Sequence, residues 1–575
     1  EGGGEGGGGE GGGEGGGGEG VFGHGQRGAG YCFMDSPGND LESIAGQVAT
    51  GCNVIYFSTG NGSITNFPFV PTLKVVSTSK RFSLMARDMD VDAGEASTPQ
   101  GMAVAGEKLF RTTLAVASGE RTKGEASGHY QLQIWRDWIQ PNPFTSPTPS
   151  AAPTPPPLVA PTGAPLPLAP LAPSVAALAE QHYFLGLPAA RATPLTVGAT
   201  GAPTSEWLCL LLPTSLCSSE VARGIAAELD AKYSSGAAAN DGSGEGEGGG
   251  GQGASARGGV RFVALPHTEG CGVSDASIGA RTLVGHLRSP LVSHALLLEH
   301  GCEKTHNDYF KEELRAKQIE TAHFGWASLQ ADGGIANAKA NVAAFFEAKL
   351  PATLPAAVRL PSDLASLGVA FLLELQQQPP PTTTTDATAT HDAATATPSS
   401  SSASALPPPL VLALAQIATL FGSHGRAVLP STSPLLASSL FLDAAIAQPA
   451  APTLAFGEYA ERPGLHVMHA PSTRWVETLS GLGATGVHLV LAWRPPGAPA
   501  PPGHPMVPML AIQVQPEGEP PCAWADILLP EAAPATWLSL ILSKLSQAAS
   551  AAYVPRAMAS ANIDFQLPRG AACSL

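Results

Sequence analysis

Residues 261–272 read RFVALPHTEGCG and residues 294–308 read HALLLEHGCEKTHND, and these two stretches decide the fold class. Each begins with a short, continuous apolar run and ends in a polar turn that contains glycine. Runs of this kind are typical of buried parallel strands. The polar side chains would then lie at the carboxyl ends of neighbouring strands, which is where open α/β sheets place their ligands.

A third stretch follows the same pattern. Residues 207–212 predict a strand, residues 213–218 (PTSLCS) a loop that holds Cys217, and residues 219–232 a helix. We therefore expect three polar loops to converge on one edge of a sheet. Three such loops are a stronger signal than any one motif.

The chain as a whole predicts an α/β protein with several βαβ-type parallel-sheet domains joined by disordered linkers. In its amino-terminal part, strands are expected at Tyr31–Met34, residues 53–57 and Thr72–Val76. A helix is expected from Leu41 to Thr50, with Asp40 as its N-cap. These elements together make one βαβ unit.

Composition divides the chain into segments, because runs rich in Gly, Pro, Ser or Thr have little to bury. The expected segments are a Gly/Glu-rich linker (1–20), an α/β domain (21–140), a Pro/Ala-rich linker (141–176), an α/β domain with the polar loops (177–350) and a disordered insertion (235–258), a connecting segment (351–376), a disordered linker (377–409) and a degenerate copy of the first α/β domain (410–575).

An internal repeat supports the last of these assignments. Three motifs recur in the same order: GYCFMDSP (30–37) as GLHVMHAP (464–471), ExxxGxxATG (42–51) at 477–486, and PTLKV (71–75) as PMLAI (508–512). The polar groups differ, since Asp35 becomes His469 and Lys74 becomes Ala511. We interpret the second copy as a structural or interface domain.

Charge and cysteine content exclude several classes of protein. The formal net charge is −16 and no basic cluster occurs, which argues against nucleic acid and anionic membranes as partners. No apolar run approaches a membrane-spanning length. Eight cysteines in 575 residues are no disulfide framework, so we expect reduced thiols and the cytoplasm, with an organelle left open. The chain begins with Glu1, so we take it as a fragment and infer no targeting signal.

Imidazole, thiol and carboxylate groups on converging loops can hold a divalent metal. Cysteine among the ligands favours Fe or Zn over Mg, and the absence of a CxxC pair argues against a structural zinc site. The predicted metal ligands are His267, Cys271, Cys302, Glu303 and His306.

Such a metal could stabilise the enediolate that forms when a base removes the proton next to a carboxylate. The predicted catalytic residues are Glu269 and His300 for proton transfer, and Lys74 as a charge that orients the carboxylate. A Gly-rich loop presents backbone N–H groups to an anion. The predicted substrate-binding residues are Gly60, Asn61, Gly62, Ser63 and Asp35.

Structural roles are the alternative for each residue taken alone. A single His or Cys after a strand is more often packed in a core than bound to a ligand, and Asp35 and Asp40 would serve equally well as turn or cap residues. The density of titratable groups in residues 267–271 and 300–306 favours function for the group.

The first domain resembles one known family. Its motifs FMDSPGND (33–40), GQVATGCNVIYFSTGNGS (46–63), VPTLKV (70–75) and DMDVDAG (88–94) are similar to the carboxy-terminal part of the altronate/galactarate dehydratases. PTSLC (213–217), LPHTEGCG (265–272) and LLLEHGCEKTHNDYF (296–310) resemble a module of the long members of that family, and residues 464–492 and 564–569 their far end.

The resemblance implies a metal-dependent lyase, typically with iron(II) and with Mn or Zn as alternatives. Such a lyase dehydrates a sugar acid such as D-altronate to a 2-keto-3-deoxy acid. The resemblance also implies a missing amino-terminal part. Two departures bear on the substrate: Asn61 stands where shorter members usually have Arg, and the low-complexity insertions are foreign to the compact enzymes.

Two competing functions stay open. One is a related lyase that acts on galactarate or another hydroxy-acid, such as a sulfonated acid. The other is a non-catalytic, degenerate paralogue or partner subunit, which the degenerate second copy favours and the intact polar loops oppose. The expected partner is a small-molecule sugar-acid substrate, and a homo-oligomer stays open.

Overall fold

The computed structural model describes residues 30–36, 38–134, 163–181, 183–186, 207–238, 260–270, 277–350, 358–375, 406–447 and 452–568. The predicted linker 1–20, the predicted linker 377–409 up to residue 405, and most of the predicted insertion 235–258 lie outside the described residues. Cys271, a predicted metal ligand, lies outside them as well.

The first unit is a three-stranded parallel sheet in the order β1-β2-β3. Its elements are α1 (Asp40–Ala49), β1 (Ile55–Thr59), β2 (Thr72–Val76), α2 (Ser79–Leu84), β3 (Val91–Asp92), α3 (Pro99–Ala117) and α4 (Lys123–Ala126).

The middle unit is a four-stranded parallel sheet in the order β6-β5-β7-β8. Its elements are β5 (Trp207–Pro213), α6 (Leu216–Ala238), β6 (Val260–Ala264), α7 (Ser277–Leu287), β7 (Val292–Glu299), α8 (Asn307–Ala316), η1 (Thr321–His323), β8 (Gly325–Ser328) and α9 (Ile335–Lys349). The predicted α/β fold with parallel sheets is confirmed.

The third unit is a six-stranded parallel sheet in the order β12-β11-β10-β13-β14-β15. Its elements are η2 (Leu364–Ser366), β10 (Gly368–Leu373), α10 (Pro408–His424), β11 (Arg426–Pro430), η3 (Pro434–Ala437), α11 (Ser439–Ala445), β12 (Gly464–Met468), α12 (Trp475–Gly483), β13 (Leu489–Trp493), β14 (Met509–Gln515), β15 (Ile527–Pro530), η4 (Pro534–Thr536), α13 (Trp537–Ala549) and α14 (Arg556–Ala559). A short helix, α5 (Pro173–Ala179), and a two-stranded antiparallel ladder, β4 (Tyr183–Gly186) with β9 (Val358–Asp363), complete the described elements.

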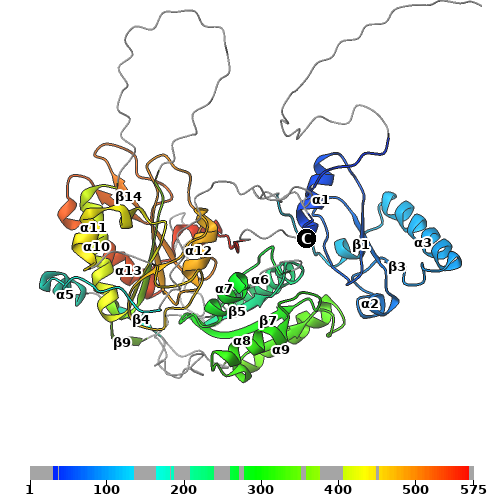
Figure 1. The fold of residues 1–575 in the computed structure, drawn as a ribbon, viewed down its shortest axis with the longest axis horizontal. Helices are drawn as coiled ribbons and strands as arrows, with labels where there is room; N and C mark the ends of the chain where they lie inside the picture. Colours follow the sequence, from blue (N-terminus) through cyan, green and yellow to red (C-terminus); the bar gives the residue numbers. More distant parts are fainter. Residues whose placement is uncertain are drawn as a thin grey trace, which may run out of the picture.

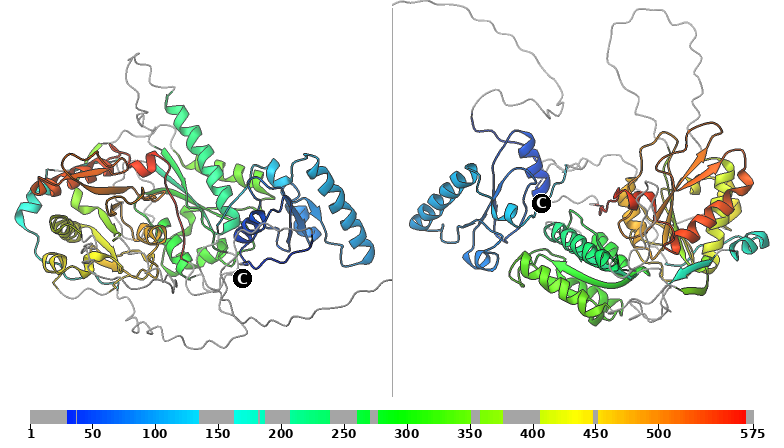
Figure 2. Two further views of the ribbon diagram at one scale, coloured as in Figure 1. Left: turned by 90° about the horizontal axis from the view of Figure 1, so that it is seen from above. Right: turned by 180° about the vertical axis from the view of Figure 1, so that it is seen from behind.

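The middle unit lies between the other two (Figures 1 and 2). One hydrophobic core joins the first unit to the middle unit, with Leu41 and Met85 packed in the same cluster as Cys217 and Leu329. A second core joins the middle unit to the third. Among the described residues, no helix combines the length and the apolar character that a membrane crossing requires.

The internal repeat is confirmed down to single hydrogen bonds. The N–H of Ile55 donates to the carbonyl of Pro71 at 3.0 Å, and the N–H of Val490 donates to that of Pro508 at 2.9 Å. Asp90 Oδ2 accepts from the N–H of Lys74 at 2.8 Å, and Asp526 Oδ2 accepts from the N–H of Ala511 at the same distance. Strands β1-β2-β3 therefore correspond to β13-β14-β15.

Several expected boundaries differ from the structure. Residues 351–376 are more than a connection, because β10 within them is an inner strand of the third sheet. Helix α5 begins in the predicted 141–176 linker, and its Val175 and Ala179 pack in the core of the third unit. The third unit therefore recruits chain from before the middle unit, which no local pattern marks.

Two local predictions in the first unit were wrong. Tyr31–Met34 forms no strand, although its equivalent in the repeat is β12. The N-cap of α1 is Asn39, whose side chain accepts from the N–H groups of Leu41 and Glu42, and Asp40 is the first helical residue. Asn and Asp cap helices about equally well, so the sequence could not separate them.

Candidate functional site

The three polar loops meet at the carboxyl edge of the middle sheet, as predicted. The N–H of Thr214, after β5, donates to the carbonyl of Leu298 in β7 at 3.1 Å. The N–H of Leu216 donates to the carbonyl of Glu269, after β6, at 2.8 Å. Parallel neighbours place their ends together, so the register of β5, β6 and β7 brings the loops into contact.

Glu303 organises the turn after β7. Its Oε1 accepts from the Thr214 hydroxyl at 2.6 Å and from the N–H of His300 at 2.9 Å. Its Oε2 accepts from the N–H groups of Gly301 at 2.7 Å and Cys302 at 2.9 Å. Burial raises the pKa of Glu303, but these donors outweigh it and hold the pKa below its usual range. Both oxygens are occupied, so Glu303 holds the turn as an anchor.

His300 and Cys302 form the reactive part of this turn. His300 Nε2 lies 2.9 Å from the carbonyl oxygen of Gly62, which can only accept, so the ring proton sits on Nε2. The lone pair on Nδ1 then faces Cys302 Sγ at 3.1 Å. Burial lowers the pKa of His300, but its interactions with Cys217, Cys302 and the Glu303 carboxylate outweigh burial and raise the pKa to about 9. The pair can exist as imidazolium and thiolate, or as two ligands of one cation.

The Gly-rich loop of the first unit lies against this turn. Thr59 Oγ1 accepts from the N–H groups of Gly62 and Ser63, each at 3.1 Å, and Gly62 has a positive φ of 79°. Ser63 Oγ lies 3.3 Å from Cys217 Sγ and 3.4 Å from Asp40 Oδ2. Burial, together with Cys302, raises the pKa of Asp40, which the Ser63 hydroxyl only partly offsets.

Further cross-contacts fix the loop in place. Gln330, after β8, contacts the carbonyl of Asn61 through its side-chain amide, and Arg81 of α2 contacts the oxygen of the same amide. Asn39 Nδ2 donates to the carbonyl of Thr268 at 3.4 Å, which links α1 to the loop after β6. The candidate site is therefore built from both units.

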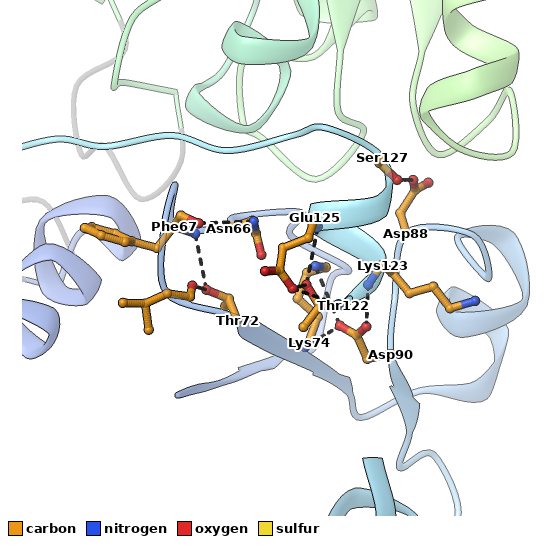
Figure 3. Close-up of polar contacts among 11 residues, drawn as sticks. Asn66, Phe67, Thr72, Lys74, Asp88, Asp90, Thr122, Lys123, Glu125 and Ser127 are labelled. Atoms are coloured by element: carbon orange, nitrogen blue, oxygen red, sulfur yellow. Dashed lines mark hydrogen bonds and ion pairs between the residues drawn. The ribbon is translucent and has the colours of Figure 1, made fainter. Parts of the chain in front are cut away.

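Lys74 lies in a second polar cluster beside this interface (Figure 3). Its side chain is fully buried on β2, and its Nζ is 3.6 Å from Asp90 Oδ2. Burial lowers the pKa of Lys74, although Asp90 and Asp88 partly offset this. Among the described atoms, Lys74 Nζ and Asn66 Oδ1 are buried without a hydrogen-bond partner.

His129 links the two clusters. Its ring is buried, and both Lys74 and His300 are close enough to act on it electrostatically. Burial, Lys74 and His300 together lower the pKa of His129 to about 3, so this imidazole is neutral. Lys74 and His300 are thus parts of one neighbourhood, although they come from different units.

Comparison with known proteins matches the same two units. The model of the D-galactarate/altronate dehydratase carboxy-terminal domain matches residues 19–140, and that of the second domain of D-galactarate dehydratase/altronate hydrolase matches residues 208–352. These two units are therefore similar to two domains of the galactarate/altronate dehydratase family.

Curated relatives are similar over a short part of their length. The β subunit of (2R)-sulfolactate sulfo-lyase from Chromohalobacter salexigens is 30% identical over 110 residues, 19% of this chain and 28% of that protein. The altronate dehydratases of Escherichia coli strain K12 and Bacillus subtilis strain 168 are each 28% identical, over 19% of this chain and 22% of each enzyme. The aligned stretch thus spans about a quarter of the length of these relatives.

The predicted metal ligands lie in different surroundings. Among the described residues, His300, Cys302 and Glu303 have donor atoms within 4.8 Å of one another. His300 Nδ1 and Cys302 Sγ fit a divalent metal, since a carbonyl on the other ring nitrogen is the usual support of a ligating His. The oxygens of Glu303 already accept four hydrogen bonds, so we assign Glu303 to supporting the turn and not to binding the metal.

His267 is held by backbone groups of the neighbouring loops. Its Nε2 is 3.1 Å from the carbonyl oxygen of Pro213, and its Nδ1 accepts from the N–H of Glu269 at 3.2 Å, so both ring nitrogens are engaged. Burial lowers the pKa of His267. Beside it is a cavity of about 30 Å³, lined by Thr214, His267, Glu269 and Leu567 among others. The predicted proton-transfer residue Glu269 therefore lies with His267, and Thr214 of the same cavity donates to Glu303.

The remaining predicted residues differ in their exposure to solvent. His306 is exposed at the N-cap position of α8, and its side chain makes no capping hydrogen bond. Asp35, Gly60 and Asn61 are exposed, whereas Gly62 and Ser63 are buried in the interface. The structure therefore gathers His300, Cys302, Gly62, Ser63 and Lys74, whereas His267 and Glu269 line a small cavity beside Thr214 and His306 is exposed.

Sequence reasoning missed three neighbours of the site. Asp40 lies beside Ser63, and Asn66 and His129 both lie beside Lys74. Asp40 was expected only as a cap, whereas Cys217, which also lies beside Ser63, was expected in one of the converging loops. Asn66 and His129 follow no motif, so only the packing of β2 and α4 reveals them.

Proposed function

We propose that this chain is a hydro-lyase that removes water from a sugar acid of the altronate type and yields a 2-keto-3-deoxy acid. The observation that carries the proposal is the contact between the His300–Cys302 turn and the Gly62–Ser63 backbone. It joins the two units of a dehydratase family into one buried polar site.

In this proposal His300 Nδ1 and Cys302 Sγ hold a divalent metal, Fe(II) first and Mn or Zn as alternatives, because imidazole and thiolate favour soft cations over Mg. When bound, the metal supplies positive charge against the enediolate that forms as the substrate loses its proton. Glu303 fixes the turn, and the carbonyl of Gly62 fixes the tautomer of His300.

Lys74 is the proton-transfer residue in the proposal. Burial favours its neutral amine, which is the form that can accept the proton next to the substrate carboxylate. His129, neutral beside it, can pass or receive a proton without adding charge. Ser63 and the N–H groups of its loop would bind the substrate carboxylate.

A panel of acids tests the reaction. Anaerobically purified protein, loaded with Fe(II), Mn(II) or Zn(II), is assayed for 2-keto-3-deoxy acid from D-altronate and galactarate, and for sulfite from (2R)-sulfolactate. We expect a keto-deoxy acid from D-altronate with Fe(II). Sulfite release from (2R)-sulfolactate without any keto-deoxy acid would instead favour a sulfo-lyase reaction like that of the C. salexigens relative. No product from any acid would favour a non-catalytic paralogue.

The expected cytoplasmic location belongs to the same proposal, because a Cys-ligated Fe(II) site requires reduced thiols. Localisation of the tagged chain by fractionation would test it.

A further inference from the structure

Arg81 brings a half-buried positive charge to the candidate site. It belongs to α2, which follows β2 at the carboxyl edge of the first sheet. Within the described part of the chain, its guanidinium donates to Gln330 Oε1 of the middle unit and pairs with no carboxylate. A guanidinium is a planar fork of several N–H donors, so the others are available to a ligand.

The side chain of Gln330 fixes where this charge lies. It is buried, its Nε2 donates to the carbonyl of Asn61, and the same nitrogen lies 3.5 Å from His300 Nδ1. The backbone N–H of Gln330 donates to the carbonyl of His300 at 3.1 Å. One amide therefore connects the guanidinium of Arg81 to the Gly-rich loop of the first unit and to the His300–Cys302 turn.

The other cations around the site are less suited to hold an anion. In the proposed function Lys74 is a neutral amine, and the loop 60–63 contains neither Lys nor Arg. Lys80 precedes Arg81 and Lys304 follows the turn, but both are exposed. Water and salt screen the attraction between an exposed ammonium and a bound anion. Arg81 is therefore the half-buried cation that α2 contributes to this edge.

The proposed reaction also requires a second positive charge. Loss of the proton next to a carboxylate turns one negative charge of the acid into two on the enediolate. A divalent cation held by the Cys302 thiolate and a neutral His300 ring keeps one net positive charge. One negative charge of the reacting acid is then left for a fixed cation, and a preorganised guanidinium is suited to stabilise it.

The internal repeat shows that the fold itself does not need this cation. Strand β14 corresponds to β2, but the described segment after it, residues 516–526, contains no helix equivalent to α2 and neither Arg nor Lys. The same copy has Ala511 in place of Lys74. The copy that lost the lysine has thus also lost the guanidinium, although it kept the parallel strands. This favours a functional role for Arg81.

We propose that Arg81 binds the carboxylate of the sugar acid through two parallel N–H···O hydrogen bonds and stabilises the enediolate that forms from it. The assignment rests on the proposed function, because it concerns the same site and the same class of substrate. Gln330 is a positioning residue, since it holds the guanidinium. The site should therefore select acids over neutral molecules of the same shape.

Calorimetric titration tests this binding without catalysis. The metal-free full chain is titrated with D-altronate and with D-altronamide, which has the same carbon chain and no charge. Arg81→Gln should weaken D-altronate binding by at least about tenfold and leave D-altronamide binding unchanged, because the charged pair forms only with the acid. Arg81→Lys keeps the charge without the fork, so its affinity for D-altronate should lie between those of the wild type and Arg81→Gln.

Lys80→Gln is the matched control, because Lys80 lies beside Arg81 in α2 and is exposed. It should bind both ligands as the wild type does. Equal D-altronate affinity in Arg81→Gln and the wild type would overturn the proposal, as would a wild type that does not bind D-altronate. An equal loss of affinity for D-altronamide would show that Arg81 only supports the structure, and would overturn it as well.

Turnover of the Fe(II)-loaded chain separates this proposal from the proposed function. We expect kcat/KM for D-altronate to fall by at least about a hundredfold in Arg81→Gln, since the charge acts on the enediolate as well as on the acid. Binding through Arg81 without any keto-deoxy acid from the wild type would remove the hydro-lyase assignment and leave the carboxylate site. Dehydration by the wild type with unchanged kinetics in Arg81→Gln would overturn the role of Arg81 alone.

Discussion

At the scale of single residues, Glu303 shows how a motif side chain can serve the site without touching substrate. It accepts one hydroxyl and three backbone N–H hydrogen bonds from the residues around it. Hydrogen bonds to a charged acceptor are each worth about 1.5–3 kcal/mol. The sequence favoured Glu303 as a metal ligand. A carboxylate beside His and Cys has the same sequence pattern whether it binds a metal or accepts hydrogen bonds from the turn.

Replacing this carboxylate should therefore lower both the stability of the protein and its affinity for the metal. Glu303→Gln turns a donor amide toward the N–H groups, and we expect the unfolding free energy of the middle unit to fall by about 2–4 kcal/mol. Urea unfolding followed by circular dichroism measures this. Glu312→Gln, on the exposed side of α8, is the matched control. An unchanged midpoint for Glu303→Gln would show that the turn holds without its anchor.

At the scale of elements, α4 packs on β2 at a glycine where any side chain would displace its neighbours. A Cβ at Gly124 would lie 2.7 Å from Lys74 Nζ and 2.6 Å from Asn66 Oδ1. The capping box of Thr122 and Glu125 fixes α4, so the helix cannot easily move away. Gly124 therefore sets the position of Lys74.

Gly124→Ala should displace Lys74 and lower turnover by at least about tenfold, with a destabilisation of about 1–3 kcal/mol from overpacking. Gly224→Ala is the control, because a Cβ there meets nothing within 4 Å and the helix α6 should gain about 0.5–1 kcal/mol. Steady-state assays and thermal unfolding of both variants make the comparison. Full activity in Gly124→Ala would remove Lys74 from the proposed mechanism.

A helix or strand was predictable from its local sequence wherever the neighbouring element that it packs or pairs with is also present. Strand β2 matches its predicted bounds, and the loops after β5, β6 and β7 meet as expected. Residues 31–34 failed because a strand needs a neighbour, which their own sequence cannot show. His267 and His300 have equally polar contexts in the sequence, and they differ only in whether Nδ1 accepts a backbone N–H or faces a thiol.

At the scale of the whole molecule, a pair of buried histidines joins the middle and third units. His286 Nδ1 donates to the carbonyl of Thr282 at 2.7 Å, so its Nε2 accepts from His504 Nε2 at 3.1 Å. His504 Nδ1 accepts from the N–H groups of Met506 and Val507. Both rings are neutral, since burial lowers the pKa of His286 to about 4 and that of His504 well below its usual range.

This pair should make the junction acid-sensitive. An unfolded histidine takes up a proton below about pH 6.5, and the folded pair does so only at much lower pH. Stability is therefore fully present above pH 6.5 and falls by about 1.4 kcal/mol per pH unit for each ring below it. Melting temperatures from pH 7.5 to pH 5 should show a smaller slope for His286→Leu/His504→Leu than for the wild-type chain. Equal slopes would contradict the neutral pair.

The most direct test of the central claim is the iron content of the anaerobically purified chain after Fe(II) loading and desalting, measured beside D-altronate turnover. We predict bound iron in the wild type and in Cys52→Ala, whose thiol is exposed. Cys302→Ala should lose at least about tenfold in both iron affinity and turnover, as ligand loss requires. Unchanged iron content in Cys302→Ala would contradict a metal site at the His300–Cys302 turn.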